Sequence, residues 1–496
     1  MNKPFYLAIT FILLILLFSN LCATAQIKDN CVFLKGTYIE VGIAPNGSFG
    51  TPVNAPKGYH SRPIPLSFAM YNPADKTFEE RDSALGFVAD FGKDGWDKGS
   101  PAYFGDYFMP GTEQEGFSVQ VNGIKSTAYS SNYTVRGASG FTGPLSGKNI
   151  SLTTEGSSLV SVWEGNAIVS DGGSNKPLIV RQTVKMNMEK SYFVINVFLK
   201  NSDTATLRNV YYMRTVDPDN EVSLTGDFST INKISFQLPN IYSKTLVTAT
   251  GGNYKNAYLG LGTKDCLAKA FVVDDDLFPK QDLEDIYNEN TSYIYKDSFV
   301  NDVGIGIIFK IGDMAPGDST SFAYAYILNE EDLDDAFNET IPGLSYNGTY
   351  YPSGSVIVQP TGTVIPLELV NGDGYNWLWS PDVHIDTTQG TKVNATVSDT
   401  ATTYTISGTG NGVNAGRCAN NLLNITISPY PVSPPPTVLS PVEYCMNDNA
   451  EPLFATGPGT IKWYTSPTGG SYTLLPPTPS TSGAGTFTWY VTQELE

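Results

Sequence analysis

The segment SYFVINVFLK, residues 191–200, decides the fold class of this chain. Its apolar side chains occupy alternate positions, at Phe193, Ile195, Val197 and Leu199. Because successive side chains of a β-strand point to opposite faces, all four lie on one face of an extended segment. This alternation predicts a strand with one face buried in a core.

The same alternation continues on both sides of this segment. It occurs in Thr183–Met188, Asn209–Arg214 and Ser321–Leu328. Clusters of turn-forming residues separate these segments, for example Asp171–Ser174 and Ala315–Asp318. The chain is also rich in strand and turn formers, with 29 Tyr, 25 Phe, 47 Gly and 32 Pro. Strands at short spacing without helices between them predict an all-β protein built on a large β-sandwich.

Two short segments carry helical signals. Gln281–Glu289 and Glu330–Phe337 are acidic, and each predicts a short helix. Asn329 stands just before the second segment, where a side-chain oxygen accepts hydrogen bonds from the first N–H groups of a helix.

Length and charge limit the domain count and the partners. A chain of 496 residues is too long for one core and suggests about three domains. It contains 30 Lys and Arg against 49 Asp and Glu, a net charge of −19. Because this charge repels nucleic acid and anionic membrane surfaces, we expect neither as a partner.

The first 25 residues have the organisation of a secretory signal peptide. Lys3 supplies a positive charge, Phe5–Phe18 is uncharged, and Ala23–Ala25 forms a small-residue cleavage site. The apolar run of about 14 residues is shorter than the roughly 20 needed to span a bilayer, and no later segment is apolar enough to do so. We therefore expect a mature chain that begins at Gln26 and is secreted, either extracellular or on the outer cell surface.

Composition divides the rest of the chain into three domains and a linker. We expect a large β-sandwich in residues 26–345, a small sandwich in residues 346–428, and a last, incomplete one in residues 438–496. Prolines crowd into residues 429–437 and predict a stiff spacer. The strands expected in the first small sandwich are Val356–Val358, Val364–Val370, Tyr375–Trp379, Thr391–Val397, Thr402–Ser407 and Leu422–Ile427.

The last domain carries a family likeness in four stretches, Tyr444–Asp448, Ile461–Gly470, Pro477–Thr481 and Thr488–Gln493. Together they resemble an Ig-like repeat that recurs in tandem in large secreted Bacteroidetes proteins. The resemblance implies that Cys445 pairs with a second cysteine after the closing strand. We therefore expect the native chain to continue past Glu496, with the last domain truncated here.

The domain before it is similar to the PKD-like domains that accompany such repeats. The likeness lies in Tyr375–Pro381 and Thr402–Gly408. It implies an Ig-like sandwich with Trp377 or Trp379 in the core and the other tryptophan facing out. The expected fold is thus all-β, with a large N-terminal β-sandwich followed by two small Ig-like sandwiches.

The large region resembles β-supersandwich domains, which often handle carbohydrate. The similar stretches are Asn201–Asp203, Leu207–Asn220 and Met314–Asp318. Proteins that combine these modules are commonly exported by the type IX secretion route. The resemblance implies a role in adhesion, gliding or polymer degradation.

The sequence offers little for catalysis. Its two histidines are His60 and His384, and only His60 is placed to act as a general base. A histidine held in a loop by its neighbours explains His60 without catalysis and is the favoured interpretation. The chain has no Gly-x-Ser-x-Gly, His-Glu-x-x-His or Cys-x-x-Cys motif, so no catalytic residue is predicted.

The densest aromatic segment, residues 96–117, is a candidate sugar platform. We single out Trp96, Tyr103, Asp106 and Tyr107 as ligand-binding residues. Aromatic rings stack on the apolar faces of sugars while carboxylates bind the hydroxyls. The alternative is a Gly-rich aromatic loop that covers one end of the sandwich.

A second candidate site is a Ca²⁺ site formed by Asp217, Asp219 and Glu221. The three acids alternate, so an extended segment would project them to one side, with Asn220 nearby. Carboxylate oxygens are the ligands that Ca²⁺ prefers. The alternative is a turn that closes a strand with Asp217–Asn220.

These observations favour extracellular adhesion or glycan binding, with an extracellular glycan or surface polymer as partner and the small domains as spacers. The alternative is a secreted polysaccharide-degrading enzyme with its catalytic carboxylates in the N-terminal domain, since glycoside hydrolysis needs only two suitably separated acids.

Overall fold

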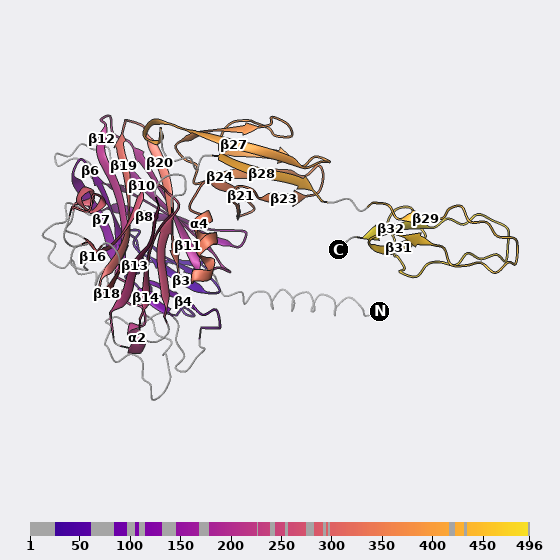
Figure 1. Cartoon of the computed structure of the whole chain (residues 1–496), viewed down its shortest axis with the longest axis horizontal. Helices are drawn as coiled ribbons and strands as arrows, with labels where there is room; N and C mark the ends of the chain where they lie inside the picture. Colours follow the sequence, from indigo (N-terminus) through magenta and orange to yellow (C-terminus); the bar gives the residue numbers. More distant parts are fainter. Residues whose placement is uncertain are drawn as a thin grey trace, which may run out of the picture. The chain divides into compact units, whose positions relative to one another are not determined.

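Strands account for most of the chain in the computed structural model, and they pack as sandwiches (Figure 1). The structure describes residues 25–60, 84–96, 105–108, 115–130, 145–167, 178–225, 227–238, 244–252, 256–273, 282–290, 294–295, 298–415, 422–430 and 434–494. The all-β sandwich expectation is confirmed. In these ranges, no helix is long and apolar enough to cross a membrane.

The segment that predicted the fold forms strand β11 (Tyr192–Asn201). Phe193, Ile195, Val197 and Leu199 are fully buried in the main core, as the alternation predicts. The opposite face is not fully solvated, because Tyr192 and Val194 pack in a second cluster with α4. β11 therefore lies inside the sheet with both faces largely covered.

The large sandwich pairs two antiparallel sheets. The nine-stranded sheet has the order β18 (Ser298–Asn301), β13 (Thr230–Leu238), β14 (Lys244–Gly251), β15 (Tyr258–Thr263), β20 (Ser319–Ile327), β11, β10 (Leu178–Asn187), β9 (Ser158–Ala167) and β8 (Ser146–Glu155). The six-stranded sheet has the order β17 (Ile294–Tyr295), β16 (Ala268–Val273), β19 (Gly304–Met314), β12 (Leu207–Val216), β6 (Glu115–Val121) and β7 (Ile124–Ser130).

The core lies between these two sheets and is rich in aromatic rings. Phe322 of β20 packs on Phe309 of β19 and on Tyr212 of β12, with ring centroids 4.3 and 5.2 Å apart. Such rings bury large apolar areas, which is the main favourable term in folding.

A third sheet completes the core. It is five-stranded, in the order β1 (Ala25–Lys28), β2 (Cys31–Lys35), β3 (Ile39–Ile43), β4 (Phe87–Ala89) and β5 (Gly105–Phe108). Phe87 of β4 packs against Phe193 and Tyr326 of the nine-stranded sheet.

Two short helical segments form where the sequence predicts them. α3 (Leu283–Tyr287) begins after Asp282, and the 3₁₀-helix η3 (Glu330–Asp332) begins after Asn329, whose side chain accepts from the Glu331 N–H. η3 continues into α4 (Leu333–Asn338), so both helix predictions are confirmed. The other short helices among the described residues are α2 (Val222–Thr225) and η4 (Gly412–Asn414).

The small sandwich has two four-stranded sheets. One has the order β22 (Thr349–Tyr351), β21 (Gly343–Tyr346), β24 (Val364–Val370) and β26 (Lys392–Thr396); the other has β23 (Val356–Gln359), β28 (Leu422–Pro429), β27 (Thr402–Gly410) and β25 (Tyr375–Ser380). All six predicted strands are present.

The expectation that one tryptophan of β25 faces out is wrong. Trp377 and Trp379 are both buried, at 3% and 1% exposure, and Leu378 between them is 51% exposed. Residues two apart on a strand share a face, so both indoles enter the core together.

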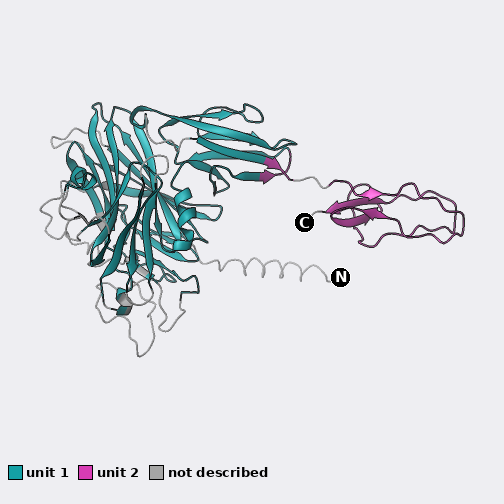
Figure 2. Cartoon of the chain, in the orientation of Figure 1, with its two compact units in different colours: residues 1–357, 362–427 teal, residues 358–361, 428–496 magenta. Residues whose placement is uncertain are grey.

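The chain separates into two compact units, residues 1–357 with 362–427, and residues 358–361 with 428–496 (Figure 2). Within residues 434–494 the second unit has two two-stranded sheets, β29 (Thr437–Val438) with β30 (Ala455–Thr456), and β31 (Thr460–Tyr464) with β32 (Tyr490–Glu494). Trp463 is its one buried hydrophobic residue in that range, whereas several large apolar side chains are exposed: Leu439, Met446, Phe454, Leu474, Leu475 and Phe487.

Candidate functional site

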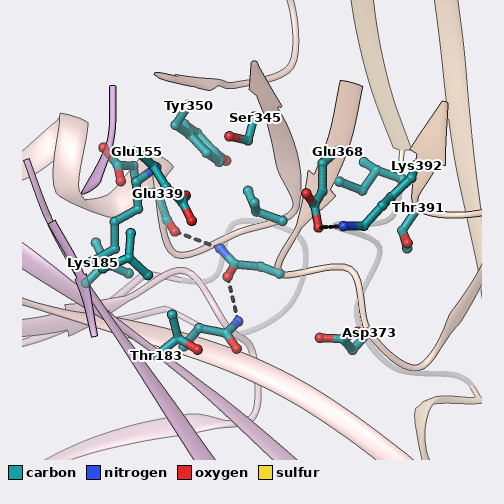
Figure 3. A pocket seen from close by; sticks show the side chains of 16 residues that line it. Glu155, Thr183, Lys185, Glu339, Ser345, Tyr350, Glu368, Asp373, Thr391 and Lys392 are labelled. Atoms are coloured by element: carbon teal, nitrogen blue, oxygen red, sulfur yellow. Dashed lines mark hydrogen bonds and ion pairs between the residues drawn. The ribbon is translucent and has the colours of Figure 1, made fainter. Parts of the chain in front are cut away.

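A cleft of about 430 Å³ opens between the large and the small sandwich, inside the first unit (Figure 3). Strands β8, β9, β10 and β11 supply one wall, and β21, β22, β24 and β26 supply the other. Its lining is dominated by polar side chains, namely Glu155, Thr183, Lys185, Asn196, Glu339, Ser345, Tyr350, Glu368, Asn371, Asp373, Thr391 and Lys392.

Strand alternation places the polar groups of the first wall. Thr183 and Lys185 of β10 flank Val184, which is buried in the main core on the opposite face. Thr183 lies directly across from Asn196 of β11 in the antiparallel register. The outer face of the large sandwich is therefore polar here and becomes the floor of the cleft.

Two asparagines join the walls. The Asn196 Nδ2 donates to Asn371 Oδ1 at 2.6 Å, and the Asn371 Nδ2 donates to the carbonyls of Glu339 and Ile341 at 2.7 and 3.1 Å. Asn371 has φ +56°, the left-handed region that asparagine tolerates well. These three bonds hold the two sandwiches in one arrangement around the cleft.

Carboxylates surround this bridge (Figure 3). Glu339 accepts a 2.6 Å hydrogen bond from the Tyr192 hydroxyl, and Glu368 forms a 2.9 Å ion pair with Lys392. Asp373 is solvent-accessible, yet partial loss of water raises the pKa of its carboxyl, Arg181 opposes the shift, and Glu368 adds to it. Glu368 therefore disfavours the ionised form of Asp373.

Of the four residues of the proposed aromatic platform, the structure describes the side chains of Trp96 and Tyr107. Tyr107 is fully buried in the main core, where its hydroxyl donates to the Leu328 carbonyl at 3.3 Å, so it does not reach a ligand. Trp96 is half-buried, and its Nε1 donates to the Thr37 carbonyl at 2.9 Å. Tyr103 and the side chain of Asp106 lie outside the described residues.

Trp96 contacts the histidine that the sequence singled out. The rings of His60 and Trp96 stack with centroids 4.1 Å apart and planes 3° apart. The His60 Nδ1 lies 3.0 Å from Glu40 Oε1, and Lys35 Nζ lies 2.7 Å from the same oxygen. These contacts hold His60 in its loop. Glu40 gave no signal in the sequence, since a buried acid of β3 looks like any polar residue of a strand.

Of the predicted metal ligands, the structure brings together Asp217 and Asp219 but not Glu221. Their carboxylate oxygens lie within 4.8 Å of each other and of one from Asp302, which follows β18. Glu221 has φ +73°, and its Oε1 accepts from the Ala257 N–H at 2.9 Å. The backbone is not extended here, so the alternation that grouped the three acids does not hold.

A buried amide lies next to these acids in the chain. Asn220 is 1% exposed, and its Nδ2 donates to the carbonyls of Ala249 and Ala257 at 3.0 and 2.8 Å. In the described part of the chain its Oδ1 makes no hydrogen bond. Carboxylate oxygens such as those of the three clustered acids are ligands that Ca²⁺ prefers.

A fourth polar cluster is sealed inside the large sandwich. The Arg214 Nε lies 2.5 Å from Glu115 Oε1, and both side chains have no exposed surface. Burial opposes the charged form, but Glu115 and neighbouring tyrosine hydroxyls outweigh it and hold the pKa of Arg214 well above its ordinary value. No ligand reaches this pair, so we interpret it as structural.

Comparisons with known proteins give no family. No protein-family model matches the chain, and no curated protein matches it. Among solved structures, the chain is similar to a polysaccharide lyase, with 11% identity and a TM-score of 0.21 over 64% of this chain and 40% of the lyase chain. It is also similar to a Klebsiella pneumoniae protein described as an aldose 1-epimerase, with 12% identity and a TM-score of 0.25 over 62% and 85% of the two chains. Similarities of this extent assign no activity.

Proposed function

We propose that this chain is an exported, cell-surface adhesion protein that binds a glycan in the cleft between the large and the small sandwich. The observation that carries the proposal is the lining of that cleft, where amides, hydroxyls, carboxylates and lysines from two sandwiches converge. Sugar hydroxyls donate and accept hydrogen bonds, and such a set of fixed polar groups matches them. The small sandwich is then part of the site rather than a spacer.

The open, preformed cleft suits an extended ligand. Strands of both sandwiches supply most of the lining, and the asparagine bridge joins the two walls without a ligand. A preformed site loses little conformational entropy on binding. An adhesion protein with such a cleft binds internal units of a surface polymer as well as its ends.

Binding to a panel of immobilised glycans tests the proposal. We expect the intact chain to retain at least one glycan class, and Lys185→Ala combined with Thr391→Ala to weaken that binding about tenfold or more, the loss of roughly 1.4 kcal/mol of contacts. Lys200→Ala is the matched control, since Lys200 is an exposed lysine of β11 outside the cleft. Equal binding by the cleft variant and the control would show that the cleft is not the site.

Polysaccharide cleavage is the second candidate, and one observation favours it. The raised pKa of Asp373 beside Glu368 is the kind of environment that suits a general acid. Release of new reducing ends from a polysaccharide, lost on Asp373→Asn, would establish an enzyme. Retention of glycan without release would establish a binding protein.

Export is proposed from the first 25 residues alone. Mass analysis of protein secreted by the native host is expected to find Gln26 at the N-terminus. An intact Met1 on secreted protein would contradict signal cleavage.

A further inference from the structure

The net negative charge of the cleft disfavours anionic glycans. This inference rests on the proposed function, in which the cleft binds a glycan. Four carboxylates line the cleft, from Glu155, Glu339, Glu368 and Asp373, against the ammonium groups of Lys185 and Lys392. The lining thus carries an excess of two negative charges. Uronate and sulfated sugars would bring further negative charge into this space, and like charges at close range are unfavourable.

The lysines do not cancel this charge where it is densest. Lys392 pairs with Glu368, and both side chains are more than half exposed, at 73% and 52%. Arg181, the other cation near Asp373, is held by Glu164 through two hydrogen bonds of 2.9 and 2.6 Å. Arg181 still acts on Asp373 more strongly than Glu368 does, but among the described cleft-lining residues no lysine forms an ion pair with Asp373. A ligand cation placed between the two carboxylates would relieve their repulsion.

We propose that the cleft recognises a glycan with free amino groups, the protonated amine lying between Asp373 and Glu368. The hydroxyls of the same sugar bind the neutral groups, among them Thr183, Thr391 and Ser345. Glu368 lies on β24, Thr391 immediately precedes the neighbouring strand β26, and Figure 3 shows Asp373 on the same side of the cleft. Proximity to both carboxylates favours the protonated amine over the neutral one.

Three matched probes test this selection on the intact chain, namely oligosaccharides of glucosamine, of N-acetylglucosamine, and of alternating N-acetylglucosamine and glucuronate. Calorimetry is expected to give about tenfold tighter binding of the glucosamine probe than of its neutral N-acetyl form, and the weakest binding for the uronate probe. Added salt is expected to reduce the difference, because mobile ions screen exposed charges.

The variant Asp373→Asn removes one negative charge from the cleft and leaves the size of the side chain nearly unchanged. It is expected to bring the glucosamine and N-acetylglucosamine affinities to within about twofold of each other, with the larger change in the glucosamine affinity. Asp399→Asn is the matched control, an exposed acid of the small sandwich outside the cleft, and it is expected to keep the full preference.

The outcomes separate this inference from the proposed function. Equal affinities for the amine and N-acetyl probes, or tighter binding of the uronate probe, would overturn the selection of amines. The cleft would remain a glycan site if Lys185→Ala with Thr391→Ala still weakened binding of the neutral N-acetylglucosamine probe. Failure of all three probes, together with an empty glycan panel, would overturn both.

Discussion

Two glutamate–cation pairs show how differently one kind of contact behaves in two regions of this molecule. Glu115 and Arg214 lie between the sheets of the large sandwich, 2.5 Å apart, with no exposed surface. Glu368 and Lys392 lie on the small sandwich at the cleft, 2.9 Å apart, and are 52% and 73% exposed. The distances are similar, so the difference in their roles comes from water.

The buried pair of Glu115 and Arg214, called the sealed pair below, is held by a hydrogen-bond network. Glu115 also accepts from the Phe49 N–H at 2.6 Å and from the Tyr326 hydroxyl at 2.9 Å, and Arg214 donates to Gln182 at 3.1 Å. Two buried nitrogens of this network, Arg214 Nη2 and Gln182 Nε2, make no hydrogen bond in the described part of the chain. A buried charge is costly unless paired, so each partner depends on the other. The open pair has water as an alternative partner.

Arg214→Met is expected to have the largest effect on stability. It leaves the Glu115 carboxylate buried without its cation, which costs about 3–5 kcal/mol. Denaturant unfolding monitored by fluorescence measures the loss. Adding Glu115→Leu to this variant is expected to recover part of it, because the uncompensated charge is then gone. A single variant as stable as the native chain would show that water reaches the pair.

Within β25, adjacent residues repeat the contrast between sealed and open. Trp379→Ala removes a 1% exposed indole whose Nε1 donates to the Gly390 carbonyl at 3.0 Å, and it is expected to cost about 3–5 kcal/mol. Leu378→Ala removes a 51% exposed side chain and is expected to change stability by about 0.5 kcal/mol or less. Similar losses for both variants would mean that Leu378 is covered in solution.

The sequence predicts the strands well because alternation is a local property. Phe193 and its partners identify a buried face from ten residues of sequence. The same rule, applied to Trp377 and Trp379, already places both on one face, although only one was assigned to the core. For strands, the alternation of side chains therefore identifies the buried face correctly. The error at Trp377 and Trp379 came from not applying this rule to both residues.

The candidate site could not be predicted from strand alternation, because it depends on which sheet faces lie side by side in the fold. The cleft joins residues from 155 to 392, and alternation does not say that the outer face of β10 packs beside β24 and β26. Aromatic density did not distinguish a platform from a core, so Tyr107 was misassigned. The three-acid pattern assumed an extended backbone, which Glu221 leaves at φ +73°.

The carboxylates of Asp217, Asp219 and Asp302 offer a third setting, in which a metal ion takes the place of arginine. If they bind Ca²⁺, the free energy of unfolding is expected to rise by about 2.7 kcal/mol at a Ca²⁺ concentration one hundred times the Kd. Thermal unfolding in chelator and in Ca²⁺ measures this. Asp219→Asn is expected to abolish the response, whereas Glu221→Gln, which still accepts from Ala257, is expected to keep it.

If Glu221→Gln abolished the Ca²⁺ response and Asp219→Asn kept it, Glu221 would be a ligand and Asp219 would not. A melting temperature that is the same in chelator and in Ca²⁺ would leave the turn interpretation of Asp217–Asn220.

Asp332 is intermediate between the sealed and the open pair. Its side chain is 8% exposed and is bonded to the Ser191 N–H and hydroxyl, with Lys93 at 3.0 Å. Burial raises its pKa, but these bonds outweigh it and hold the pKa below the ordinary value. The stabilisation is therefore complete above the pKa of an unfolded aspartate and is lost as the pH falls through the folded value. Urea unfolding across the acid range is expected to show this loss in the native chain and a smaller one in Asp332→Asn.

Lys392→Ala is expected to have the smallest effect on stability and a measurable one on binding. Exposed ion pairs contribute about 0–1 kcal/mol, because water solvates both partners when the pair is broken. The melting temperature is therefore expected to stay close to that of the native chain. The Glu368 carboxylate, however, loses its counter-ion beside Asp373, and the cleft becomes more negative. An amine-bearing glycan should then bind more tightly and show a steeper dependence on salt, which calorimetry at two salt concentrations measures. A large loss of stability would instead place Lys392 with Arg214 as a structural cation, and the contrast between the two pairs would fail.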